Sequence, residues 1–249
     1  DVTPRLAVDD LWVRGDRGRD ALRGVSLQVH AGEILGIAGV SGNGQRELAE
    51  ALTGLRPVTK GRVRVNGRDL THASPLQRIA AGQSAIPEER MKDGVVKDFS
   101  VAENLILQDH GHLPFSRGGF MNPAAITRES AALVKDFNVK TPTLDTPTKN
   151  LSGGNIQKLI LARELSRKPV VLVCAQPSRG VDIGATEYIH QRLLEQRERG
   201  MATLLISEDL DELLALSDRI GVMYEGRLMA VMDRAEATPA RLGLLMAGV

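Results

Sequence analysis

The sequence has one cysteine, no long apolar run and almost no net charge, and each lack excludes a class of protein. Cys174 has no partner for a disulfide, which fits a reducing, intracellular setting, and its apolar surroundings predict a buried strand residue. The longest apolar run, "VVLVCA" at 170–175, is far shorter than the roughly 20 residues that cross a bilayer. Its 32 basic and 31 acidic residues are scattered, so we expect no nucleic-acid partner.

Apolar patterning predicts an α/β fold. Short apolar or alternating runs bounded by Gly or Asn predict strands, and longer amphipathic runs predict helices. Early strands are expected at 6–13, 25–29, 33–39 and 62–67. Later elements are expected as strand 169–175, helix 185–200, strand 202–207, helix 210–218 and strand 220–226. This alternation indicates a mostly parallel core sheet, with an antiparallel β part near the N-terminus.

The middle of the chain carries helix signals instead. Ser100 and Glu103 form a capping box, and Pro123 opens an amphipathic run that ends near Phe137. We therefore expect a helical subdomain over residues 88–167, inserted into a core made of 1–87 and 168–249.

A glycine-rich loop, "GVSGNG" at 39–44, lies between a predicted strand and a predicted helix. Gly39, Gly42 and Gly44 permit backbone conformations in which successive N–H groups turn toward an anion at the positive end of the helix. The pattern G-x-x-x-x-G-K-[ST] is met in its glycines and missed at Gln45 and Arg46. Taken alone, the loop fits a phosphate site or a plain structural turn.

A second candidate is "LSGGN", residues 151–155. Ser152 can cap the helix that follows, and two glycines leave the first turn bare, so its N–H groups and the hydroxyl can receive a phosphate. The alternative is an ordinary Ser-capped helix start, which by itself would not demand consecutive glycines.

Taken together, the "GVSGNG" loop, "LSGGN" and the strand running into "AQPSRGVD" resemble an ABC transporter nucleotide-binding domain over nearly the whole chain. The resemblance implies a P-loop NTPase-like ABC ATPase fold with ATP as the ligand of the core. It makes "LSGGN" the signature motif, Asp182 the D-loop residue and "ISED" the switch segment. The implied nucleotide-binding residues are Gly39, Val40, Ser41, Gly42, Asn43, Gly44, Gln45, Arg46 and Glu47. The implied signature residues are Leu151, Ser152, Gly153, Gly154 and Asn155.

Six positions depart from that family's pattern. In the glycine-rich loop, Gln45 replaces the Lys that binds phosphate, and Arg46 replaces the Ser or Thr that binds magnesium. After the strand 169–175, Ala175 replaces the Walker B Asp and Gln176 replaces the catalytic Glu. Glu88 replaces the Q-loop Gln, and Glu208 replaces the switch His. Loss of the Lys alone weakens nucleotide binding about tenfold to a hundredfold. With the base and both magnesium ligands also gone, we expect weak nucleotide binding, no magnesium ligands and no hydrolysis by the isolated domain.

The fate of Arg46 stays open at this point. Its guanidinium either neutralises phosphate charge where the metal usually lies, or is a solvated helix residue. A metal site elsewhere is not expected, because only His110 and His112 are close in sequence and no carboxylate or Cys has ligand spacing.

With its intact signature and degenerate loop, the chain resembles the C-terminal cassette of the fused ATPase subunit of importers for simple sugars or nucleosides. In that family two cassettes pair, and the signature of one completes the ATP site of the other. The resemblance therefore implies that this signature contacts ATP and Mg²⁺ held by the N-terminal cassette of the same subunit or by a second nucleotide-binding domain. The first residue, Asp1, then marks a cut from a longer polypeptide. The resemblance also implies two membrane permease subunits, a solute-binding protein acting indirectly, and a peripheral place on the cytoplasmic face of the membrane.

Two other functions remain open. One is a non-transport ABC protein, of which basic surface or coiled-coil inserts and intact Walker residues would be expected. The other is a structural pseudo-ATPase domain that binds no nucleotide, against which only the intact signature speaks.

Overall fold

A computed structural model describes residues 3–249, and these residues form two compact units. The first unit comprises the residues up to Ala85 together with Pro169–Gln176 and His190–Val249. The second comprises Ile86–Lys168 and Pro177–Ile189.

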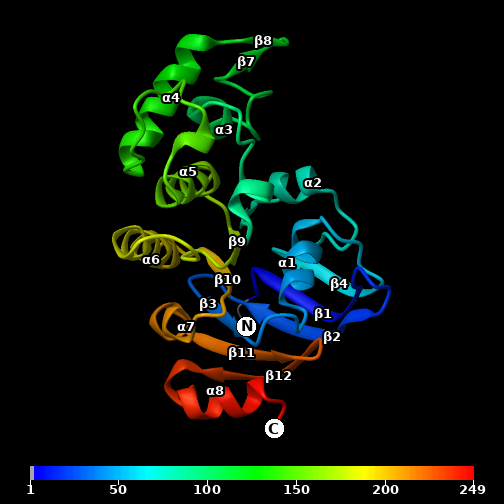
Figure 1. Ribbon diagram of the computed structural model, residues 1–249. Helices are drawn as coiled ribbons and strands as arrows, with labels where there is room; N and C mark the ends of the chain where they lie inside the picture. The colour runs from blue at the N-terminus through cyan, green and yellow to red at the C-terminus, as the bar shows by residue number, and fades with distance from the viewer. Residues whose placement is uncertain (1–2) are drawn as a thin grey trace. The chain divides into compact units, whose positions relative to one another are not determined.

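The first unit is built on a six-stranded sheet with the order β12-β11-β3-β10-β9-β6 (Figure 1). The strands β11, β3, β10 and β9 pair in parallel, and β12 is antiparallel to β11. Every residue of β3, β9 and β10 is buried, which explains their continuous apolar runs. The strand bounds are Ile34–Ala38 (β3), Gln83–Ile86 (β6), Val171–Ala175 (β9), Ala202–Ile206 (β10), Arg219–Tyr224 (β11) and Arg227–Asp233 (β12).

A second sheet of the same unit has the order β2-β1-β4-β5, and its pairs are antiparallel. Its strands are Leu6–Arg14 (β1), Asp20–Val29 (β2), Lys60–Val65 (β4) and Arg68–Asp69 (β5). Expected strand 62–67 ends earlier than predicted, because Asn66 and Gly67 adopt left-handed φ angles of 49° and 75° and turn the chain into β5.

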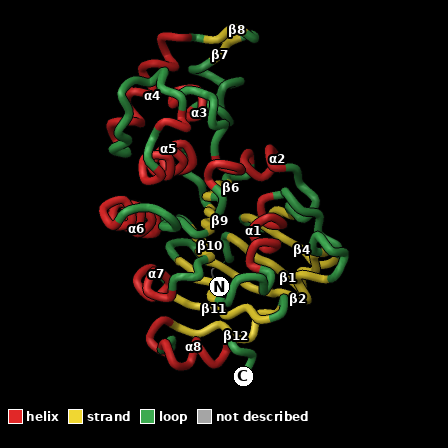
Figure 2. Tube along the Cα trace, viewed as in Figure 1, coloured by secondary structure: helices red, strands yellow, loops and turns green. Residues whose placement is uncertain are grey.

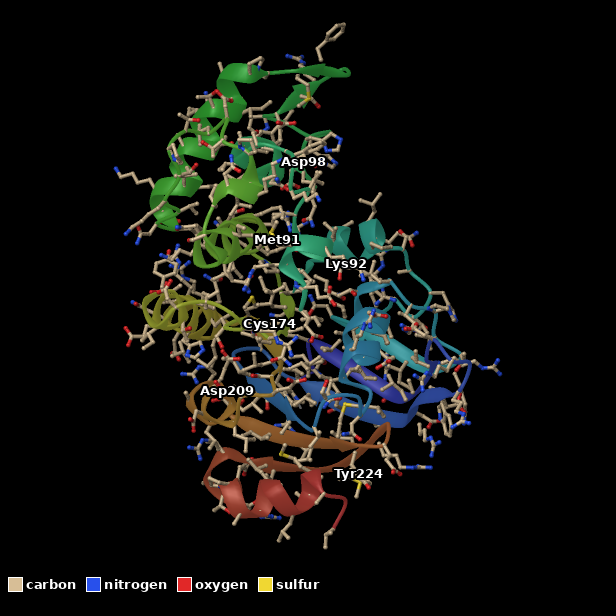
Figure 3. The ribbon with its side chains drawn as sticks, in the orientation of Figure 1. Met91, Lys92, Asp98, Cys174, Asp209 and Tyr224 are labelled. Carbon is tan, nitrogen blue, oxygen red and sulfur yellow. The ribbon has the colours of Figure 1, made fainter. Side chains whose placement is uncertain are left out.

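Helices cover the first unit. They are α1 (Gln45–Thr53), α2 (Pro75–Ala80), α7 (Leu210–Leu216) and α8 (Pro239–Met246), with a 3₁₀ turn at Arg234–Glu236 and the end of α6 (Ile183–Glu198). The helix α1 turns Leu48 and Leu52 into the core shared by the two sheets, and α8 lies beside β11 (Figure 1). Cys174 is buried in β9 as expected (Figure 3).

The second unit is mainly helical (Figure 2). It contains α3 (Val101–Leu105), α4 (Pro123–Asp136), α5 (Gly153–Ser166), a π-helical turn Arg90–Gly94, a 3₁₀ turn Thr148–Asn150 and the short pair β7 (Ser116–Arg117) and β8 (Phe120–Met121). The predicted capping box at Ser100 and Glu103 is formed. Asn104 is fully buried and bonds the backbone of Val96 and the hydroxyl of Thr148, which ties three segments of this unit together.

The predicted fold class is confirmed in its mostly parallel core sheet and its N-terminal antiparallel sheet. Sequence patterning missed α2, β6, β12 and α8, and the short strands β5, β7 and β8. Within residues 3–249, none of the helices combines the length and the apolar character that crossing a membrane requires.

Candidate functional site

The glycine-rich loop joins β3 to α1 in the first unit, as the sequence predicts. Gly44 precedes the helix with a left-handed φ of 105°, and a Cβ there would lie 2.7 Å from the carbonyl oxygen of Ala21. Gly42 has a φ of 89° and open space around it. Gly44 is therefore fixed by packing as well as by backbone conformation, whereas Gly42 faces outward.

The two side chains that open α1 point in different directions. Gln45 is buried, and its amide turns back into the loop. Arg46 is exposed, and its Nε donates to Glu50 Oε1 at 2.7 Å. This hydrogen bond is the main cause of a raised pKa of the Arg46 guanidinium. Arg46 is thus a permanent cation on the helix surface.

Beyond the carboxyl end of β9, Gln176 is linked to the switch segment. Gln176 has a left-handed φ of 48°, and its Oε1 accepts a hydrogen bond from the backbone N–H of Glu208 at 3.1 Å. Its own N–H donates to the carbonyl of Ile206 at 2.8 Å. A neutral amide therefore joins the ends of β9 and β10, at positions where the resemblance implies a carboxylate and a histidine.

A buried polar cluster that sequence reasoning missed lies beside this segment. Glu212 of α7 accepts from the hydroxyl of Ser207 at 2.8 Å and meets His190 Nε2 at 2.7 Å. Asp209, labelled in Figure 3, caps α7 through the N–H groups of Asp211 and Glu212. A signal was present: Glu212 lies on the helix face of Leu216, and a carboxylate on an apolar face requires partners.

The "LSGGN" segment lies in the second unit and starts α5. The hydroxyl of Ser152 accepts from the backbone N–H and the side-chain amide of Asn155, at 3.3 and 2.9 Å. Asn155 Oδ1 accepts from the N–H of Lys140 at 2.9 Å. Ser152 itself is exposed. The helix cap is thus held by Asn155 and Lys140, and the Ser152 side chain remains exposed.

The paired glycines have a packing reason as well. A Cβ at Gly154 would lie 2.9 Å from the Cβ of Ala185 and 3.3 Å from a carboxylate oxygen of Asp182. A Cβ at Gly153 would lie 3.3 Å from the carbonyl of Gly180. Close approach of the D-loop therefore accounts for part of what the sequence argument ascribed to a ligand.

Two arginines tie the segment after β6 to the D-loop, all within the second unit. Arg179 donates to the carboxylate of Glu88, the Q-loop position. Arg90, which the sequence argument did not single out, donates to the carbonyls of Arg179 and Gly180 at 2.5 and 3.2 Å. Desolvation lowers the pKa of Arg90. Asp182 caps α6, and the N–H of Ala185 is the main cause of its lowered pKa.

The expected site residues therefore fall into two sets. The first unit holds residues 39–47, Ala175, Gln176 and Glu208, and the second unit holds Glu88, residues 151–155 and Asp182.

The residues of the first unit are suited to the phosphates of the ATP that the resemblance implies, but not to its magnesium ion. Backbone N–H groups at the start of α1 suit phosphate. Magnesium is different, because it prefers hydroxyl, carboxylate and water oxygens, whereas Arg46, Ala175 and Gln176 offer a guanidinium, a methyl and an amide that is already bonded. This loop does not fit a protein-held magnesium ion. Across residues 3–249, no three His, Cys, Asp or Glu side chains gather as a metal site.

Comparison with known proteins bears on the family and the fold. The sequence profile of the family described as "ABC transporter" matches residues 22–179. The chain is 45% identical over 243 residues to the guanosine import ATP-binding protein NupO of Bacillus subtilis, covering 98% of the chain and 48% of that protein. It is 46% identical over 247 residues to the glucose import ATP-binding protein TsgD13 of Haloferax volcanii, covering 98% and 45%.

The fold has a solved counterpart. A nucleotide-free ATP-binding cassette from an ABC transporter superposes with a TM-score of 0.82 at 22% identity, covering 99% of each chain. The chain spans about half the length of the curated relatives it matches. ATP binding is typical of such ATPases. On its sequence profile and its fold, this chain belongs to the ABC transporter family of ATP-binding domains.

Proposed function

We propose that the chain is the C-terminal, degenerate cassette of an ABC importer ATPase subunit that takes up nucleosides or simple sugars. One observation carries this proposal: the start of α5 is complete and anchored, while the loop at the start of α1 lacks its phosphate lysine and metal ligand. An intact signature is useful only if it meets ATP held by another cassette.

The start of α5 supplies the donors for that role. The hydroxyl of Ser152 is exposed, and the bare turn at Gly153 leaves backbone N–H groups at the positive end of a 14-residue helix. Asn155, fixed by its bonds to Ser152 and Lys140, keeps the turn in place. The segment thus presents a preorganised group of donors to a γ-phosphate.

The chain's own loop is proposed to bind ATP weakly and to leave it intact. General-base assistance contributes about 10² to 10⁴ in rate, and the amide of Gln176 cannot accept a proton from water. With no protein ligand for magnesium at Arg46 or Ala175, the charge on the phosphates is also not offset by a metal held here. Hydrolysis is therefore assigned to the partner site.

The remaining assignments concern partners. The names of two relatives refer to guanosine import and glucose import, which supports uptake of nucleosides or sugars. Large apolar side chains are exposed in the second unit at Met91, Val96 and Phe99 (Met91 is labelled in Figure 3). They support docking of two membrane permease subunits through a helical subdomain of residues 88–167, with residues 1–87 and 168–249 as the ATP-binding core. The subunit would then lie on the cytoplasmic face of the membrane.

The proposal is tested in the full-length subunit assembled with its permeases. Ser152→Ala should lower solute-stimulated ATP hydrolysis and transport at least tenfold, since it removes a donor from the partner's ATP site. Ser166→Ala, at the other end of α5, is the matched control and should leave both rates unchanged. The 249-residue chain alone should release no phosphate from Mg-ATP.

A structural pseudo-ATPase domain is the second candidate, favoured by the packing reason found for Gly154. It predicts that Ser152→Ala leaves transport unchanged.

A further inference from the structure

The side-chain amide of Gln45 bridges the glycine-rich loop from within. Its Nε2 donates to the carbonyl of Val40 at 3.0 Å, and its Oε1 accepts from the backbone N–H of Asn43 at 3.0 Å. Reversing the amide would set oxygen against oxygen and N–H against N–H, so only this orientation satisfies both ends. Gln45 is 9% exposed, and both hydrogen bonds are partly buried.

The rest of the loop is shaped around this amide. A Cβ on Gly39 would lie 2.4 Å from Gln45 Nε2, so the glycine leaves room for the side chain. Asn43 is held on both sides, since its Nδ2 donates to the carbonyl of Val40 at 2.7 Å and its Oδ1 accepts from the N–H of Glu225 at 2.8 Å. The loop is therefore closed by protein groups alone.

Part of the loop's donor set is nevertheless available. In the part of the chain that the structure describes, the N–H groups of Gly42, Gly44 and Arg46 have no protein acceptor. The N–H of Asn43 differs because its acceptor is Gln45 Oε1. An anion that takes the N–H of Asn43 together with these three donors must first displace that oxygen, and Gln45 offers no positive charge in return.

We propose that Gln45 is an internal ligand of the loop, competing with phosphate for the N–H of Asn43 and thereby setting the loop's affinity for nucleotide. The inference rests on the proposed function in one respect, namely that residues 39–47 form a phosphate site. It reverses the usual expectation for this position: the side chain here opposes the ligand, and its removal strengthens binding.

The test is calorimetric titration of the 249-residue chain with ATP plus a chelator, and with inorganic pyrophosphate, at fixed ionic strength. Gln45→Ala should bind both about tenfold more tightly than the wild type, which is the worth of one net hydrogen bond. Gln45→Met keeps the volume but can make neither bond, so it gives the same result if the alanine variant folds poorly. Gln191→Ala, an exposed glutamine of α6, should change nothing.

Gln45→Lys adds a cation and should bind more tightly still. Equal or weaker binding by both the Ala and Met variants would overturn the inference. If neither the wild type nor any of the three Gln45 variants binds ATP or pyrophosphate, the inference is also overturned, because the loop would then take no phosphate with or without the amide.

These results are independent of the Ser152 experiment. Tighter binding by Gln45→Ala with full transport by Ser152→Ala would keep the internal ligand and reject the signature's role. Equal or weaker binding by the Gln45 variants, together with lost transport by Ser152→Ala, would reject the internal ligand and keep the signature's role.

Discussion

His190 Nε2 lies 2.7 Å from Oε2 of Glu212, a carboxylate that is almost completely buried. The second oxygen of Glu212 accepts the hydroxyl of Ser207, whose own oxygen accepts the N–H of Asp209. This chain of bonds fixes the residues on either side of Glu208 at the end of β10. The segment that the resemblance assigns to the switch is thus held in place by Glu212 and His190.

Glu212→Ala should destabilise the first unit by about 2 to 4 kcal/mol, because it leaves a cavity and strands Ser207 and His190 without their acceptor. Urea unfolding measures the loss. Asp211→Ala, its exposed neighbour in the same helical turn, is the control and should stay within about 0.5 kcal/mol of the wild type. Equal effects of the two variants would show that the cluster contributes no more than surface charge does.

Gly39→Ala should destabilise the fold by about 1 to 3 kcal/mol. The added Cβ would meet the Gln45 amide at 2.4 Å and the carbonyl of Met223 at 2.8 Å, and a backbone carbonyl yields little. Gly111→Ala, where nothing lies within 4 Å, should be close to neutral. Thermal unfolding compares the two, and a Gly39→Ala protein that melts with the wild type would contradict the packing found here.

Arg90→Ala should speed amide hydrogen exchange in the D-loop, residues 179–182, because two carbonyls lose their shared donor. Arg90→Lys keeps the charge but not the planar fork, so it should restore protection only in part. Mass spectrometry of peptides after timed exchange gives the measurement. Arg128→Ala, which breaks an exposed pair with Glu129, is the control. Unchanged exchange in Arg90→Ala would remove this residue's positioning role.

Glu33 should make stability depend on pH in the acid range. Burial alone would raise its pKa, but hydrogen bonds from Arg219 and from the N–H of His30 outweigh burial and lower it. Its contribution is therefore complete above the pKa of the unfolded chain and is lost as pH falls through the lower, folded value.

The check is the free energy of unfolding at pH about 7 and about 3.5. The wild type should lose more stability between the two than Glu33→Gln does. Glu198→Gln, at an exposed pair with Arg197, should follow the wild type. A Glu33→Gln protein with the same acid loss as the wild type would contradict the assignment.

Local signals predicted the elements with strong periodicity or capping. The buried strands around Ile37, Cys174 and Leu204 follow from uninterrupted apolar runs, and the starts of α3, α4 and α5 follow from Ser100, Pro123 and Ser152. The edge strand β12 was missed because its apolar residues 228–232 do not alternate with polar ones, and most of the strand is not buried: Leu228 is half-buried and Val231 is exposed.

The sequence by itself determined which residue types stand at 39–47, 151–155 and 206–209, the segments to which the resemblance assigns the phosphate loop, the signature and the switch, because motif spacing is a property of the chain alone. Only the tertiary structure decided what those side chains do. It turned Gln45 inward onto Asn43 and Arg46 outward onto Glu50, and it brought His190 to Glu212 across 22 residues of chain. Such contacts depend on packing between elements, where direction and burial select one partner among many that the sequence would allow.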